Sequence, residues 1–367
     1  MANKTLNAAK AAKNDEFYTQ LSDIENELRH YKEHFRGKTV LCNCDDPRVS
    51  NFFKYFTLNF EHLGLKRLIT TCYKNQDIDL FSQYECEQAV YLIYDGDKNG
   101  NHTPDADEIG VHTLKGDGDF RSRECIELLK QADIVVTNPP FSLFREYIAQ
   151  LIEYDKKFLI LGNPNALHYK EIFPLIKENK VWVGYKSMGA DMLFDVSNSM
   201  KEWLRDNKKE GSGYKIIGGI LKGRAQAIWF TNLDIKKRHE ELILYKKYSQ
   251  DEYIKYENYD AIEVGKVEDI PDEYYEIMGV PDSFLEFYNP DQFEIIGCNC
   301  STEQCRELGV KPLGQEWINR YRASGGTGHN TANMVRMVYN DRNGKPKVAF
   351  SRIIIRRKRN NYGHKTS

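Results

Sequence analysis

The alternation of short apolar runs with amphipathic segments over the first 240 residues constrains the fold more than any other feature. Apolar runs at residues 38–44, 66–72, 133–137, 157–161, 180–183 and 227–230 predict strands, and residues 15–31, 126–129 and 141–151 predict helices. Residues 87–94 and 109–114 predict a hairpin. Strands that alternate with helices favour a parallel sheet covered on both faces. We therefore predict an α/β fold with a doubly wound, mostly parallel sheet.

The alternation fades beyond about residue 245, where tyrosines, acidic residues and short strands take over. A length of 367 residues allows one large domain and one smaller domain. We predict a first domain over residues 1–240, with a polar insertion at 205–219, and a smaller, mixed second region over residues 241–367.

Charge is sorted along the chain although the net charge is only −2. Residues 341–367 carry nine Lys and Arg against one Asp, which gives +8 and leaves −10 for the rest. A basic end on an acidic body is compatible with a phosphate-binding surface and equally with a solvated tail.

The composition points to a globular protein of the cytoplasm. Hydrophobic residues make up 41% of the chain, and no apolar run is long enough for a membrane helix. The first 14 residues are polar, so we expect no secretory signal and no membrane association. The eight cysteines are then expected to be reduced thiols.

Two patterns suggest a metal, and neither is complete. Cys298, Cys300 and Cys305 are three thiols, whereas structural zinc sites take four ligands. The turn at 95–100 resembles the start of a calcium loop, but the twelfth position counted from Asp95 is Ala106 instead of Glu. We expect buried thiols and a plain hairpin turn, and therefore no metal.

The sharpest local signal is Asn138-Pro139-Pro140-Phe141, directly after the apolar run 133–137. Pro stops strands, so the segment has a plain structural interpretation as a turn. Its chemistry is more specific, because the Asn138 amide oxygen and the Pro139 carbonyl are two rigidly held acceptors that suit an NH2 group. Phe141 adds a flat face on which a base can stack. Such a group can activate the amino group of a base that has been removed from its helix.

This segment resembles the catalytic motif of amino-methyltransferases, and the form ending in Phe is typical of DNA adenine N6 enzymes. Residues 15–20, 42–56 and 116–122 resemble further motifs of one branch, the EcoRI-type adenine-specific DNA methyltransferases. Segments at 232–234, 278–281 and 352–355 also look like that family. The resemblance implies a Rossmann-like methyltransferase fold, S-adenosylmethionine as the methyl donor and double-stranded DNA as the substrate. It also allows a partner restriction endonuclease that shares the recognition site.

The resemblance implies roles for individual residues. Tyr18 and Thr19 would lie near the methionine part of the cofactor, and a first loop without glycine would use Asp45, Asp46 and Ser50. Asp119 would accept from the cofactor's adenine amino group, with the Phe120 backbone beside it. The flipped base would lie near Trp229 and Phe230. The second strand ends without the usual acidic residue for the ribose, so the resemblance names no ribose ligand.

The long remainder is expected to recognise the target sequence. Arg322, Asn330 and Arg336 are candidates for reading base edges, and Arg356 and Arg357 for binding phosphates. Ordinary surface positions remain an alternative for each of them. Three other functions also remain open: methylation of RNA, methylation of a protein glutamine amide, and DNA binding without catalysis.

Overall fold

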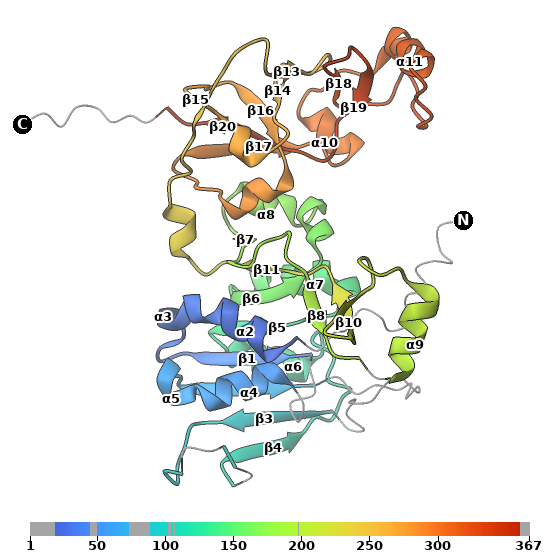
Figure 1. Ribbon diagram of the computed structural model, residues 1–367. Helices are drawn as coiled ribbons and strands as arrows, with labels where there is room; N and C mark the ends of the chain where they lie inside the picture. The colour runs from blue at the N-terminus through green and yellow to red at the C-terminus, as the bar shows by residue number, and fades with distance from the viewer. Residues whose placement is uncertain are drawn as a thin grey trace, which may run out of the picture. The chain divides into compact units, whose positions relative to one another are not determined.

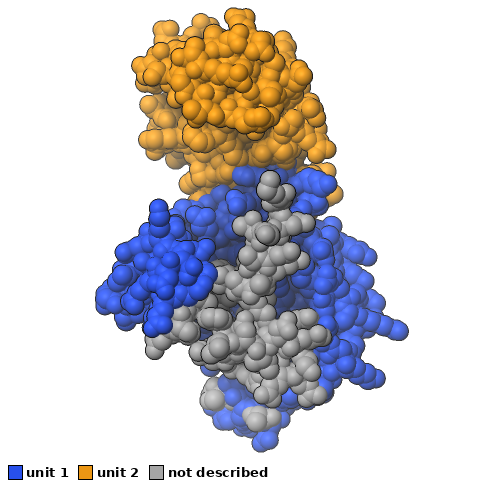
Figure 2. Space-filling view, turned by 90° about the vertical axis from the view of Figure 1, so that its right-hand side faces the viewer, with its two compact units in different colours: residues 1–173, 181–235 blue, residues 174–180, 236–367 orange. Residues whose placement is uncertain are grey.

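The computed structural model describes residues 19–44, 50–72, 89–101, 104–105, 107–196 and 198–359. The chain divides into two compact units, shown in Figure 2. Unit 1 comprises residues 1–173 and 181–235, and unit 2 comprises residues 174–180 and 236–367. Within the described part of the chain, no helix combines the length and the apolar character needed to cross a bilayer.

Unit 1 is built on an eight-stranded sheet in the order β4-β3-β2-β1-β5-β6-β11-β7. The strands are β1 (Thr39–Asn43), β2 (Arg67–Thr71), β3 (Val90–Tyr94), β4 (Ile109–Thr113), β5 (Ile134–Thr137), β6 (Lys157–Gly162), β7 (Trp182–Val183) and β11 (Ile228–Thr231). These bounds confirm the predicted strands and the predicted β3–β4 hairpin to within a few residues.

The sheet is mixed, so the prediction of a mostly parallel sheet is wrong. Only the four central strands run parallel, through the pairs β2–β1, β1–β5 and β5–β6. The pairs β4–β3, β3–β2, β6–β11 and β11–β7 are antiparallel. Apolar runs identify strands but carry no direction, so the sequence could not separate the antiparallel outer strands from the parallel central ones.

Helices cover both faces of this sheet, as Figure 1 shows. They are α2 (Leu21–Leu28), α3 (Lys32–Phe35), α4 (Asn51–Leu58), α5 (Phe60–Leu63), α6 (Arg123–Gln131) and α7 (Phe144–Glu153). Successive strand residues point to opposite faces. Trp229 therefore packs in the cluster that contains Ile24 and Phe56, while Phe230 lies on the other face with its ring 5.0 Å from that of Phe144.

A second, three-stranded sheet in the order β8-β10-β9 belongs to the same unit. Its strands are β8 (Met192–Phe194), β9 (Tyr214–Ile217) and β10 (Ile220–Ala225), and α9 (Asn198–Asn207) precedes the β9–β10 hairpin. The hairpin turns at Gly218 and Gly219, which both have positive φ. The predicted polar insertion at 205–219 thus contains strand β9, which the sequence analysis missed because polar residues flank it.

Unit 2 is a separate assembly of short strands. Its five-stranded sheet has the order β13-β14-β16-β20-β17. The strands are β13 (Ile254–Lys255), β14 (Ile262–Glu263), β16 (Ile277–Val280), β17 (Phe293–Cys298) and β20 (Ile353–Arg357). Two small pairs, β12 (Lys246–Lys247) with β15 (Pro271–Asp272) and β18 (Val338–Asn340) with β19 (Pro346–Val348), complete it together with α10 (Thr302–Glu307) and α11 (Gly314–Ala323). Helix α8 (Phe173–Lys177) begins at the last residue of unit 1 and continues into unit 2.

No disulfide joins the cysteines that the structure describes. Cys298 and Cys305 are buried, and Cys300 is half-buried with its Sγ 3.1 Å from the hydroxyl of Ser351.

Candidate active site

The strand order of unit 1 reverses between β1 and β5. The chain proceeds from β1 to β2 in one direction and from β5 to β6 in the other, so the carboxyl ends of β1 and β5 flank a crevice where open α/β sheets bind ligands. The structure ties these ends together. The hydroxyls of Thr137 and Tyr147 both donate to Asn43, one to its carbonyl and one to its side-chain oxygen. Burial raises the pKa of Tyr147 well above its usual value, so this phenol stays a donor.

The Asn138–Phe141 segment begins where β5 ends. Both prolines lack an N–H and cannot extend the strand, and Leu143 N donates to the Pro140 carbonyl at 3.0 Å, which starts a short 3₁₀ turn into α7. Asn138 and Pro139 are buried, while Pro140 and Phe141 are half-buried. The turn is therefore a fixed corner of the crevice and not a surface loop.

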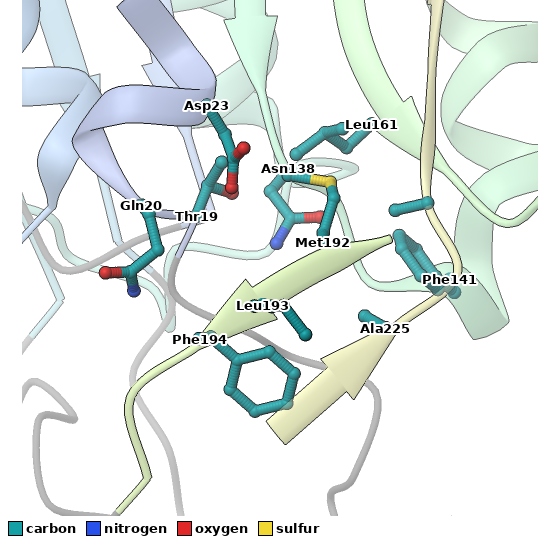
Figure 3. A pocket seen from close by; sticks show the side chains of 11 residues that line it. Thr19, Gln20, Asp23, Asn138, Phe141, Leu161, Met192, Leu193, Phe194 and Ala225 are labelled. Atoms are coloured by element: carbon teal, nitrogen blue, oxygen red, sulfur yellow. The ribbon is translucent and has the colours of Figure 1, made fainter. Parts of the chain in front are cut away.

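Asn138 and Phe141 line a pocket together with Thr19 and Gln20, which precede α2, and Asp23 in its first turn. In Figure 3 the Asn138 amide lies between Thr19 and Asp23 on one side and Phe141 on the other. Further lining residues come from β6, β8, β10 and the residue before β11, namely Leu161, Met192, Leu193, Phe194, Ala225 and Ala227. The pocket holds about 270 Å³ of space, part of it open to solvent.

Polar groups in this pocket fit a bound small molecule. The Thr19 side chain is 5% exposed, and its hydroxyl has no hydrogen-bond partner among the described residues. A buried hydroxyl without a partner is costly, so a ligand that bonds to it would be favoured. Burial also raises the pKa of the Asp23 carboxyl, although the charge of Lys186 opposes this shift. The Thr19 hydroxyl and the Asp23 carboxyl could therefore both bind a polar ligand, such as the methionine part of the expected cofactor.

The 116–122 turn reaches the same edge of the sheet. The Phe120 ring lies 5.0 Å from that of Tyr147, whose hydroxyl bonds to Asn43 at the end of β1. The Asp119 carboxylate accepts from the Arg121 guanidinium at 2.7 Å, and this hydrogen bond lowers the pKa of Asp119. Asp119 is thus ionised and held in place, although it does not line the pocket of Figure 3.

The first-loop candidates are only partly described. Ser50 caps α4, with its hydroxyl accepting from the backbone of Phe52 at 3.2 Å, so the structure assigns it at least a local structural role. Tyr18, Asp45 and Asp46 lie outside the described residues.

Trp229 and Phe230 are completely buried in β11, on opposite faces of the sheet. A side chain without exposed surface offers no face to a base. The structure therefore places both residues in core packing around the site and gives no support to direct contact with a flipped base.

The candidates for target recognition lie in unit 2 and do not form one cluster. Arg322 and Arg336 are exposed, and Asn330 is buried and accepts from Arg336 at 3.3 Å. Arg356 and Arg357 on β20 form ion pairs within the unit, with Glu294 and Asp272 respectively. Their charges are therefore partly compensated inside the protein.

The sequence analysis did not identify the pocket residues of β6, β8 and β10 or Ala227 before β11. It also did not single out Gln20 and Asp23 as binding residues. The apolar run 192–194 was the available signal, but its place beside Asn138 depends on the pairing of β8 with β10. This side of the pocket is formed by contacts between residues that lie far apart in the sequence.

Comparison with known proteins identifies the family. The sequence model of the family "Adenine-specific methyltransferase EcoRI" matches residues 5–358. Type II methyltransferase M.EcoRI of Escherichia coli is 51% identical over 296 residues, which cover 80% of this chain and 89% of that protein. Type II methyltransferases of Mycoplasma genitalium and Mycoplasma pneumoniae are each 41% identical, over 80% of this chain and 85% of their own. No solved structure matches the chain. The chain therefore belongs to the family of EcoRI-type adenine-specific methyltransferases.

Proposed function

We propose that this adenine-specific DNA methyltransferase transfers a methyl group from S-adenosylmethionine to the N6 amino group of an adenine that is flipped out of duplex DNA. One observation carries the proposal: Asn138 and Phe141 of the β5 turn line the same pocket as Thr19, Gln20 and Asp23. The corner that we propose for the base and the segment that we propose for the cofactor thus line one crevice.

Asn138 and Pro139 would act on the adenine amino group. The lone pair of that nitrogen is delocalised into the ring, so the nitrogen is a poor nucleophile. Two acceptors that bond its two hydrogens draw it toward tetrahedral geometry and stabilise the positive charge that develops on it. Phe141 would hold the ring by stacking. No residue needs to form a covalent bond with the base.

The cofactor supplies a methyl group on a positively charged sulfur, which makes that carbon electrophilic. Thr19 would bond its polar methionine part, and Asp119 would accept from its adenine. The N-terminus of α4, capped by Ser50, would face its carboxylate. Because these groups are fixed by the fold, much of the acceleration would come from alignment of the two reactants.

The first test measures methyl transfer directly. Purified protein is incubated with labelled S-adenosylmethionine and with DNA, RNA or protein as competing acceptors, and labelled products are digested to nucleosides or amino acids. We expect N6-methyladenine from DNA, at a site that sequencing of modified bases will locate. Label found only in RNA or in glutamine would favour the alternative substrates, and no cofactor binding would favour a non-catalytic relative.

The second test is Asn138→Ala, with Asn165→Ala, an exposed residue after β6, as the matched control. Loss of one acceptor aimed at developing charge typically costs about 10²–10³ in turnover. We expect that loss for Asn138→Ala with DNA and cofactor binding retained, and wild-type turnover for the control. Near-normal methylation by Asn138→Ala would defeat the assignment.

We further propose that unit 2 recognises the DNA target and that a restriction endonuclease shares the site. The exposed Arg322 and Arg336 and the basic segment 341–367 support the first proposal. Support for the second comes from the Type II designation of the relatives. Cleavage protection tests the second proposal: DNA methylated by this protein should resist an endonuclease that cuts the mapped sequence.

A further inference from the structure

The turn between β3 and β4 folds around a buried carboxylate. Glu108 is only 5% exposed, although it follows a polar turn at the edge of the sheet. Its Oε1 accepts from the backbone N–H groups of Lys98 at 2.6 Å and Asn99 at 3.1 Å. The start and the end of the turn are therefore closed onto one another through this side chain.

This closure changes the residue from which the positions of a calcium loop are counted in this turn. The Asp95 carboxylate is not directed into the turn, because it pairs with Arg67 of β2 at 2.7 Å and 3.0 Å. The first acidic residue that belongs to the turn is Asp97. Counting from Asp97 places Glu108, and not Ala106, at the twelfth position.

In this frame the side chains match the oxygen-ligand positions of a twelve-residue calcium loop. The pattern takes oxygen ligands at positions one, three, five, nine and twelve, with Glu at twelve. The corresponding residues are Asp97, Asn99, Asn101, Asp105 and Glu108. Position six, Gly in the pattern, is His102 here, and residues 102, 103 and 106 lie outside the described residues, so no ligand is assigned to them.

Three of these side chains already meet at one point. Asp105 Oδ2 accepts from Asn99 Nδ2 at 2.6 Å and from Asn101 Nδ2 at 3.2 Å. The amide hydrogens thus occupy the place that a cation would take. Rotation of the Asn101 amide by half a turn would present its oxygen instead, whereas the same rotation of Asn99 would also break the bond that its oxygen accepts from the Asn101 backbone N–H at 2.9 Å. Among the described residues no set of three carboxylate, imidazole or thiol groups surrounds a common centre, so binding also requires Asp97 and Glu108 to draw inward.

A second observation points independently to a missing positive group. Glu108 Oε2 is buried and has no hydrogen-bond partner among the described residues. An uncompensated carboxylate oxygen in the interior is costly.

We propose that Asp97, Asn99, Asn101, Asp105 and Glu108 form a calcium site through their side-chain oxygen atoms. The donor set contains only oxygen atoms, which selects a hard cation, and a flexible turn suits Ca²⁺ better than the strict octahedron of Mg²⁺. The site revises the expectation of no metal. It takes no part in methyl transfer, and it would fix the β3–β4 hairpin at the edge of the large sheet.

The test uses the full chain, freed of metals with a chelator and dialysed. Calcium chloride is titrated by calorimetry, and thermal unfolding is followed at several calcium concentrations. We expect one ion per chain, with half-saturation below about 1 mM, and a melting temperature that rises with calcium as binding to the folded state requires. Magnesium chloride should have a weaker effect at equal concentration.

Two variants of the same loop provide the matched comparison. Asp97→Asn removes a ligand charge, and Asp107→Asn changes an exposed carboxylate at position eleven, which is not a ligand position. We expect Asp97→Asn to weaken calcium binding by at least about tenfold and Asp107→Asn to change it by less than about twofold. Glu108→Gln should abolish the calcium-dependent rise in melting temperature. If Glu108→Gln does not fold, the calcium affinity of Asp97→Asn tests the proposal.

Three results would overturn the proposal. They are the absence of heat and of a melting shift up to about 10 mM calcium, equal weakening by Asp97→Asn and Asp107→Asn, and equal effects of magnesium and calcium. Because binding is measured without DNA or methyl donor, failure here is independent of the methyltransferase assignment.

Discussion

Thr19→Val tests whether the pocket of Figure 3 is built for a ligand. The Thr19 hydroxyl is buried, lines the pocket and has no hydrogen-bond partner among the described residues. Val has nearly the same shape and removes only the polar group. We therefore expect opposite effects on stability and on ligand binding.

The magnitudes follow from the cost of a buried polar group. An unpaired buried hydroxyl costs about 1–3 kcal/mol in protein variants, so the ligand-free Thr19→Val protein should gain about that much unfolding free energy. For a unit of this size each kcal/mol raises the melting temperature by about 2–4 °C. A hydrogen bond to the cofactor contributes about 0.5–1.5 kcal/mol, so S-adenosylmethionine should bind about 2- to 12-fold more weakly.

Thr70→Val is the matched control. Thr70 lies in β2, its hydroxyl is also buried without a partner among the described residues, and it does not line the pocket. Urea unfolding and calorimetric titration with S-adenosylmethionine are measured for both variants. Both should be stabilised, and only Thr19→Val should lose affinity. A destabilised Thr19→Val protein, or equal affinities for both variants, would refute the reasoning.

Three further predictions concern packing, ionisation and salt. Gly162→Ala would place a methyl group 2.5 Å from the Phe144 ring, so we expect a loss of about 1–3 kcal/mol of unfolding free energy in urea titrations. Arg121→Gln should raise the pKa of Asp119, because the Arg121 hydrogen bond lowers it. That bond stabilises the fold above the unfolded pKa of about 3.9, and its contribution is lost as pH falls through the lower folded value. Wild type should therefore be more stable than Arg121→Gln at neutral pH and equal to it in acid, as unfolding at several pH values will show. The basic segment 341–367 predicts a steep decrease of DNA affinity with salt, measured by anisotropy.

Each of these predictions has an outcome that contradicts it. Unchanged stability of Gly162→Ala would mean that the neighbouring rings move at no cost. A stability difference for Arg121→Gln that persists in acid would exclude the Asp119 carboxylate as its source. If the affinity for DNA does not depend on salt, the segment 341–367 does not bind DNA phosphates and is only a solvated tail.

The sequence by itself determined the strands and the motifs, because both are local. Apolar runs such as 133–137 are strands in the structure, since a buried strand needs continuous apolar residues whatever its partners are. The Asn138–Phe141 turn follows from two prolines that cannot extend a strand. The family resemblance rested on such segments, and the comparisons confirm it.

Only the tertiary structure decided the direction of the outer strands, the wall of the pocket and the frame of the 97–108 loop. Pairing partners lie far apart in the chain, as Trp229 beside Leu161 shows, and a local pattern carries no information about which edge or direction a strand will take. Burial is likewise a property of the whole fold. It placed Trp229 in the core and left Thr19 and Glu108 with buried oxygens for which no partner is described, because many distant residues together exclude water from these positions.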